Sequence, residues 1–108
     1  MKLYYREIGT GKPLIVLHGL LGSGENWKTI MKGLEKQYRI FLLDQRNHGN
    51  SPTADSMSYS AMADDVLEFV EEKGLESVIL LGHSMGGKTA MEFALRYPEK
   101  AAGLIVVD

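Results

Sequence analysis

The sequence contains no cysteine, so it offers neither disulfide bonds nor thiol chemistry, and its redox compartment is left open. It has no apolar run of membrane-spanning length, and its first residues lack the apolar core of a targeting signal. The formal net charge is -2 at pH 7, and no stripe of Lys and Arg suggests a nucleic-acid partner. We therefore expect a cytoplasmic protein without nucleic-acid or membrane partners.

Internal repeats, low-complexity segments and linkers are also missing. The 108 residues, of which 44% are hydrophobic, are enough for one domain with a modest core, here residues 1–108. The polar stretch 50–58 is predicted to be a loop. Short apolar runs indicate strands at about 3–8, 14–18, 39–44, 77–82 and 102–108.

Helical spacing of apolar residues appears between these runs, near 27–34, 62–70 and 90–97. Ser23 is a candidate N-cap for the first helix, and Pro98 ends the last. Strands alternating with helices predict an α/β fold, a mostly parallel sheet with helices on both faces. The strands lack polar alternation because both their faces are covered. A ligand crevice is expected where the strand order reverses, at the carboxyl ends of neighbouring strands.

The most informative segment is 78–87, where an apolar run enters Gly-His-Ser-Met-Gly and then a helical pattern. A turn from strand to helix in so few residues strains the central residue, here Ser84, and exposes its hydroxyl. The pattern predicts Ser84 as a nucleophile. It also places the backbone N–H of Met85 at a helix start, where it can stabilise a developing oxyanion.

A second interpretation uses the same residues. Gly82–Thr89 satisfies G-x-x-x-x-G-K-[ST], the phosphate-binding loop of nucleotide-binding domains. In this alternative Lys88 would reach phosphates, Thr89 would hold Mg²⁺ and Asp108 would supply a further carboxylate. Local pattern alone does not separate the two. A third alternative is a non-catalytic structural fragment, in which these residues only begin a helix and end a strand.

The rest of the chain favours the nucleophile. Another apolar run, 14–17, ends in a glycine-rich loop, residues 18–24. Acyl transfer requires two oxyanion donors, one beside the nucleophile and one from the loop after an adjacent strand. The N–H groups of Met85 and Leu20 fit these two roles. A phosphate-loop protein has no use for the glycine-rich loop that carries Leu20. The glycine order G-x-x-G-x-G is a poor match to a dinucleotide site.

The third landmark is the run 39–44, which ends in Asp44 and continues Gln-Arg-Asn-His-Gly-Asn-Ser-Pro. With H-G-x-x-G before it and G-x-S-x-G after it, the chain resembles the α/β-hydrolase superfamily over essentially its whole length. Asn47 departs from the family's commoner glycine. The R-N-H-G-x-S-P loop resembles a small esterase branch, whose members hydrolyse acyl esters and thioesters. The resemblance implies an α/β-hydrolase core truncated after strand six, with no metal or organic cofactor.

The same resemblance suggests further site residues. Asp108 stands at the end of the sixth strand, where some members carry the catalytic acid. His18 and Gly19 belong to the oxyanion loop, and with Trp27 they are expected to line the substrate pocket. Asp44 and Arg46 are expected to organise the loop after strand four.

The family's catalytic histidine has no counterpart here. His48 and His83 are not obvious substitutes, since His48 is expected to bond its own loop and His83 to point away from the serine. The resemblance therefore predicts a serine esterase that acts through an acyl-enzyme at Ser84 and is poorly active as this chain alone. It also predicts an unpaired edge on strand 102–108, and hence a homo-oligomer formed through that edge.

Overall fold

The computed structural model describes residues 1–107 as five strands in one sheet, ordered β1-β3-β2-β4-β5. β1 runs antiparallel to β3, and all other neighbours are parallel. This confirms the predicted α/β fold with a mostly parallel sheet. The strands span Tyr5–Ile8 (β1), Lys12–Leu17 (β2), Tyr38–Leu43 (β3), Val78–His83 (β4) and Ala101–Val107 (β5).

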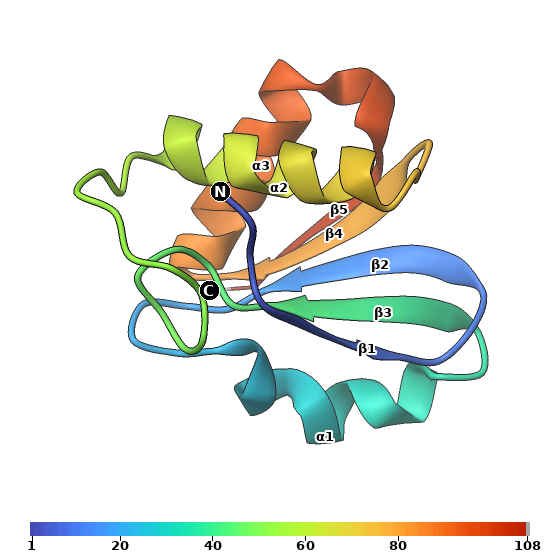
Figure 1. Cartoon of the computed structure of the whole chain (residues 1–108). Coiled ribbons are helices and arrows are strands. Elements are labelled where there is room, and N and C mark those ends of the chain that lie inside the picture. Colours follow the sequence, from blue (N-terminus) through green and yellow to red (C-terminus); the bar gives the residue numbers. More distant parts are fainter. Residues whose placement is uncertain (108) are drawn as a thin grey trace.

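Helices cover both faces of the sheet (Figure 1). On one face lie α2 (Tyr59–Glu72) and α3 (Met85–Arg96), and η3 (Pro98–Lys100) follows α3. The Ser58 hydroxyl caps α2 by accepting the Ala61 N–H at 3.1 Å. The other face carries a helical segment made of three short turns, η1 (Gly24–Trp27), α1 (Lys28–Met31) and η2 (Lys32–Leu34).

That first segment is not the single regular helix that its apolar spacing predicts. It begins as a 3₁₀ turn because the Asn26 N–H donates to the Ser23 carbonyl oxygen at 3.1 Å and the Ser23 N–H donates to Asn26 Oδ1 at 2.8 Å. Gly24 packs so tightly that a Cβ there would lie 2.8 Å from the Leu42 carbonyl oxygen. Gly33 further weakens regular helix near its other end. Backbone packing against the sheet has overridden the side-chain pattern.

Successive residues of the central strands supply two separate cores. In β2, Ile15 and Leu17 pack beneath α2 and α3, whereas Leu14 and Val16 pack against the three-turn segment. Side chains alternate between the faces of a strand, so a strand covered on both sides must be apolar throughout. All four of these residues are at most 3% exposed. This is the physical reason for the unbroken apolar runs in the sequence.

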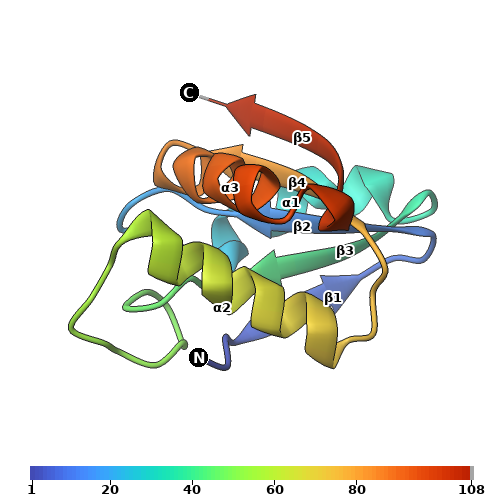
Figure 2. The same cartoon turned by 90° about the horizontal axis from the view of Figure 1, so that it is seen from above.

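The chain reverses its direction of winding between β2 and β4. From β2 it proceeds to β3 on one side, and from β4 to β5 on the other. The loops after β2 and β3 and the start of α3 therefore meet at one end of the sheet (Figure 1). β5 is the outermost strand (Figure 2), and Leu104, Ile105, Val106 and Val107 are 40–49% exposed.

Candidate active site

Ser84 is the single residue between β4 and α3, and it is exposed. Its backbone is held at φ 54° and ψ -114°, a conformation that non-glycine residues rarely adopt. The glycines on either side make this turn sterically feasible. A methyl group on Gly86 would overlap the carbonyl oxygen of Leu17, and one on Gly82 would overlap the backbone of Gly86.

The close approach of Gly86 to Leu17 brings the start of α3 against the end of β2. Met85 is the first residue of α3, so its N–H has no acceptor within the helix. The Ser84 N–H instead donates to the Val107 carbonyl oxygen at 2.9 Å, and the Lys88 N–H to the Ser84 carbonyl oxygen at 3.2 Å. The serine and the start of α3 are thus held in place by contacts with both β2 and β5, the neighbours of β4.

The glycine-rich loop turns sharply over four residues, with the Gly22 N–H donating to the Gly19 carbonyl oxygen at 3.0 Å. Its positive φ falls on Leu21, at 64°, and not on a glycine. The Leu21 N–H donates to His48 Nε2 at 3.0 Å. Within residues 1–107, the Leu20 N–H has no hydrogen-bond acceptor. That amide is therefore left for a ligand or solvent.

Two buried histidines make hydrogen bonds that hold this loop in place. His18 is 1% exposed: the Gln45 N–H donates to its Nε2 at 2.9 Å, and its Nδ1 lies 2.8 Å from the Gly19 carbonyl oxygen. His48 is 8% exposed and repeats the pattern, with Nδ1 2.9 Å from the Arg46 carbonyl oxygen. Each ring accepts an N–H at Nε2, so each carries its proton on Nδ1. Burial, opposed by the hydrogen bond to Gly19, lowers the pKa of His18.

Asp44 ties the loop after β3 to the three-turn segment. Its fully buried side chain accepts the Gly24 N–H at 2.7 Å and the Asn50 N–H at 2.9 Å, and Arg6 lies 3.4 Å away. Asp44 thus organises its loop as expected. Arg46 contributes differently, by binding another element.

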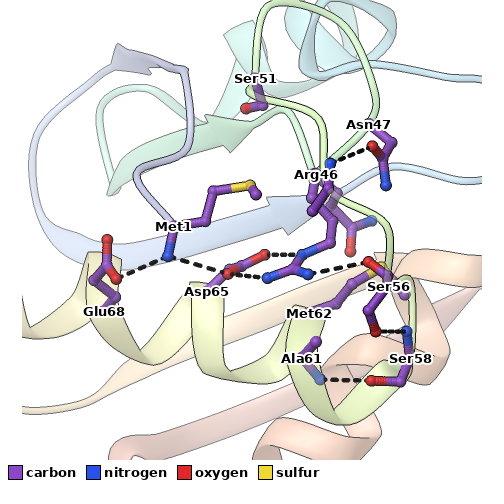
Figure 3. A network of polar contacts seen from close by, with 12 residues as sticks. Met1, Arg46, Asn47, Ser51, Ser56, Ser58, Ala61, Met62, Asp65 and Glu68 are labelled. Carbon is purple, nitrogen blue, oxygen red and sulfur yellow. Dashed lines mark hydrogen bonds and ion pairs between the residues drawn. The ribbon is translucent and has the colours of Figure 1, made fainter.

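Arg46 makes a bidentate ion pair with Asp65 of α2, at 2.7 and 2.9 Å, and donates to the Ser56 carbonyl oxygen at 3.0 Å (Figure 3). Asp65 raises the pKa of Arg46 through its hydrogen bond. The amino group of Met1 lies 3.4 Å from Asp65 and 2.8 Å from Glu68. The Arg46–Asp65 pair thus fastens the 45–58 loop to α2, and the Met1 contacts fasten the first residue to the same helix.

Ser84 lines an open cavity of about 430 Å³ at the start of α3. The predicted oxyanion residues Leu20 and Met85 line the same cavity. Sequence reasoning missed its remaining walls, which come from the end of the 45–58 loop and from two helices: Met57, Tyr59, Met62 and Lys88. The sequence pattern indicates only that residue 62 belongs to a helix, and nothing in it brings the Met57 region to this place.

The residues predicted for the substrate pocket lie elsewhere. His18, Gly19 and Trp27 line a second cavity of about 350 Å³, in which Ser84 takes no part. Leu20 borders both cavities. The Trp27 ring packs edge-on against His83, with centroids 6.0 Å apart. His83 therefore faces away from the serine's cavity, because successive residues of a strand point to opposite sides.

The phosphate-loop alternative does not agree with this geometry. Between Gly82 and Thr89 only Ser84 lies outside a strand or helix, so no extended loop can wrap a phosphate. Thr89 is fully buried, and its hydroxyl donates to the Met85 carbonyl oxygen at 3.2 Å. It is not placed to hold Mg²⁺.

Asp108, the predicted catalytic acid, lies outside the described residues. Among residues 1–107 no group of three or more His, Asp and Glu side chains is arranged to bind a metal ion. In the same part of the chain, no helix combines the length and apolar character needed to cross a membrane.

A doubly wound sheet with an exposed, strained serine between strand and helix at its switch point is the architecture of an α/β hydrolase. The comparisons with known proteins agree. The family model described as the alpha/beta hydrolase fold matches residues 12–108. The chain therefore belongs to the α/β-hydrolase fold family.

Several of the similar proteins carry esterase or lipase names. The chain is 42% identical to abhydrolase domain-containing protein C22H12.03 of Schizosaccharomyces pombe over 97% of its own length and 40% of the relative's. It is 45% identical to the sn-1-specific diacylglycerol lipase ABHD11 of Xenopus laevis, over 91% of its own length and 32% of that protein.

Among solved structures, a marine microorganism esterase superposes with a TM-score of 0.96 at 54% identity, covering 97% of this chain and 41% of the esterase. The chain thus spans about two fifths or less of the length of these similar proteins.

Proposed function

We propose that this chain supplies the nucleophile and oxyanion donors of a serine hydrolase acting on small acyl esters or thioesters. One observation carries the proposal: the exposed, strained Ser84 shares a cavity with Leu20 and Met85. The esterase and diacylglycerol lipase names of similar proteins support an ester as the substrate class.

In the proposed reaction, Ser84 Oγ attacks the carbonyl carbon and its proton passes to a base. The carbonyl oxygen becomes an oxyanion, held by the N–H groups of Leu20 and Met85. The tetrahedral intermediate collapses, the alcohol or thiol leaves with a proton, and an ester forms between the acyl group and Oγ. Water then attacks this acyl-enzyme, which releases the acid and restores the serine.

The base is the missing part. Both nitrogens of His18 and of His48 are engaged with the backbone, and His83 lines the other cavity. We propose that Asp108 orients a histidine other than these three. General base assistance is worth about 10²–10⁴ in rate. The 108-residue chain alone is therefore expected to acylate slowly and to turn over poorly.

Labelling with a fluorophosphonate tests the nucleophile. Ser84 should be modified, and Ser84→Ala should abolish the adduct, because an exposed elbow beside two N–H donors suits attack on phosphorus. Ser60→Ala is the matched control, since Ser60 is exposed but bonds Arg96 away from the cavity. Saturable Mg-ATP binding that is lost in Lys88→Ala, with no adduct at Ser84, would contradict the proposal.

We also propose that the free edge of β5 pairs with the same edge of a second copy. Its residues 103–107 carry no charge and no proline to discourage strand addition. The same edge on two copies can pair about a two-fold axis. Sedimentation of the chain should detect a dimer at micromolar concentration, and a monomer there would refute this pairing.

A further inference from the structure

His48 touches neither the serine's cavity nor its neighbour, yet it is the residue on which the exposed tip of the glycine-rich loop rests. Leu21 at that tip is 91% exposed, so its side chain contributes almost no burial to hold the loop. Its backbone is also in the strained left-handed region, at φ 64°. The placement of the tip therefore depends on the hydrogen bonds that its own backbone groups make.

His48 supplies one of these bonds, by accepting the Leu21 N–H. The 45–58 loop that carries His48 is in turn anchored to α2 by Arg46 and Asp65. Only the imidazole with Nε2 unprotonated can accept this N–H. A proton on Nε2 would set two N–H donors against each other at 3.0 Å.

We propose that His48 is a positioning residue for the predicted oxyanion loop. The neutral imidazole of His48 holds this loop in place, and protonation of the imidazole releases it. The catalytic consequence rests on the proposed function, because the N–H of Leu20 immediately precedes the residue that His48 holds. The positioning itself does not depend on any activity.

Several titratable and charged groups surround His48. The His18 ring lies 5.0 Å away between centroids, and it makes the same kind of bond to Gln45. Asp44, which precedes the same loop, is occupied by two backbone N–H groups and by Arg6. Arg46 is paired with Asp65 of α2. His83 of β4 is a further titratable group, and it lies beside Gly19 of the glycine-rich loop.

These contacts predict that acid weakens the hold on the loop. A proton on either ring of the His18 and His48 pair breaks a backbone bond and places a positive charge beside the other ring. The loop should therefore loosen on acidification.

Nuclear magnetic resonance of the ¹⁵N-labelled chain tests the positioning directly. At about pH 8 we expect the His48 ring to carry its proton on Nδ1, and on acidification the Leu21 amide should shift together with that ring. In His48→Ala the Leu21 amide should exchange with solvent about tenfold faster. His48→Gln, which can still accept a hydrogen bond but does not titrate, should restore much of the protection. A proton on Nε2 at about pH 8, or a Leu21 amide indifferent to His48, would overturn the proposal.

The rate of fluorophosphonate labelling at Ser84 supplies the second readout. Acidification from about pH 8 to about pH 5 should slow labelling more in the wild type than in His48→Gln. An equal loss in both would overturn the coupling to the site. No labelling in any variant at any pH would refute the proposed nucleophile instead, and the Leu21 measurements would still decide the role of His48.

Discussion

Replacement of Asp44 should destabilise the fold by an amount that its contacts allow to be worked out. The fully buried carboxylate accepts one backbone N–H on each oxygen, from Gly24 and Asn50. Hydrogen bonds to charged groups contribute about 1.5–3 kcal/mol each. Asp44→Asn keeps one acceptor and turns an amide group toward the second N–H, so it should lower the free energy of unfolding by about 2 kcal/mol.

Asp44→Ala loses both acceptors, and it also leaves Arg6 without this buried partner. Its cost should therefore reach about 3–5 kcal/mol, the range for breaking a buried charged contact. In a domain of this size each kcal/mol lowers the melting temperature by about 4–8 °C. The melting temperature should thus fall in the order wild type, Asn, Ala.

Urea and thermal unfolding followed by far-ultraviolet circular dichroism measure both variants. Arg39→Gln is a suitable control, because the Arg39–Glu7 ion pair at 2.7 Å is exposed and such pairs contribute little. If Asp44→Ala unfolds at the same urea concentration as Arg39→Gln, the Asp44 carboxylate does not hold the two segments together.

Three further outcomes are expected. Gly86→Ala should abolish labelling of Ser84 and lower the melting temperature, because the added methyl overlaps the β2 backbone, whereas Gly33→Ala, with open space around it, should not lower it. Asp65→Asn should cost about 2–3 kcal/mol in urea unfolding by weakening the bidentate pair with Arg46, and an unchanged midpoint would show that pair to be dispensable. Ile105→Lys should abolish the proposed dimer in sedimentation without lowering the melting temperature, and an equally dimeric variant would place the contact elsewhere.

The fold was largely readable from the sequence, because a two-sided core forces unbroken apolar strands and helical spacing between them. The approximate strand positions follow from that pattern. The irregular first helical segment does not, since it depends on how Gly24 meets the backbone of Leu42. Side-chain periodicity carries no information about such a contact.

The candidate site was predictable only in part. Motifs placed Ser84, Leu20 and Met85 at one end of the sheet, because motif position along parallel strands translates directly into position in space. The division into two cavities was not predictable. It depends on where the 45–58 loop brings Met57 and on the side of β4 that His83 faces. Those are consequences of long-range packing, on which local sequence is silent.

Three non-glycine residues have positive φ in the described chain, and they are Leu21, Asn47 and Ser84. All three follow the carboxyl ends of strands, around the proposed site. Glycine would relieve backbone strain at Leu21 and Ser84, whereas Asn47 tolerates a positive φ and its Oδ1 accepts the Ala54 N–H at 2.8 Å. Two readily available stabilising substitutions therefore coincide with positions that shape the proposed site. A laboratory selection for thermal stability alone should therefore erode the site first, and a Ser84→Gly variant that is more heat-resistant and inert would be an early product.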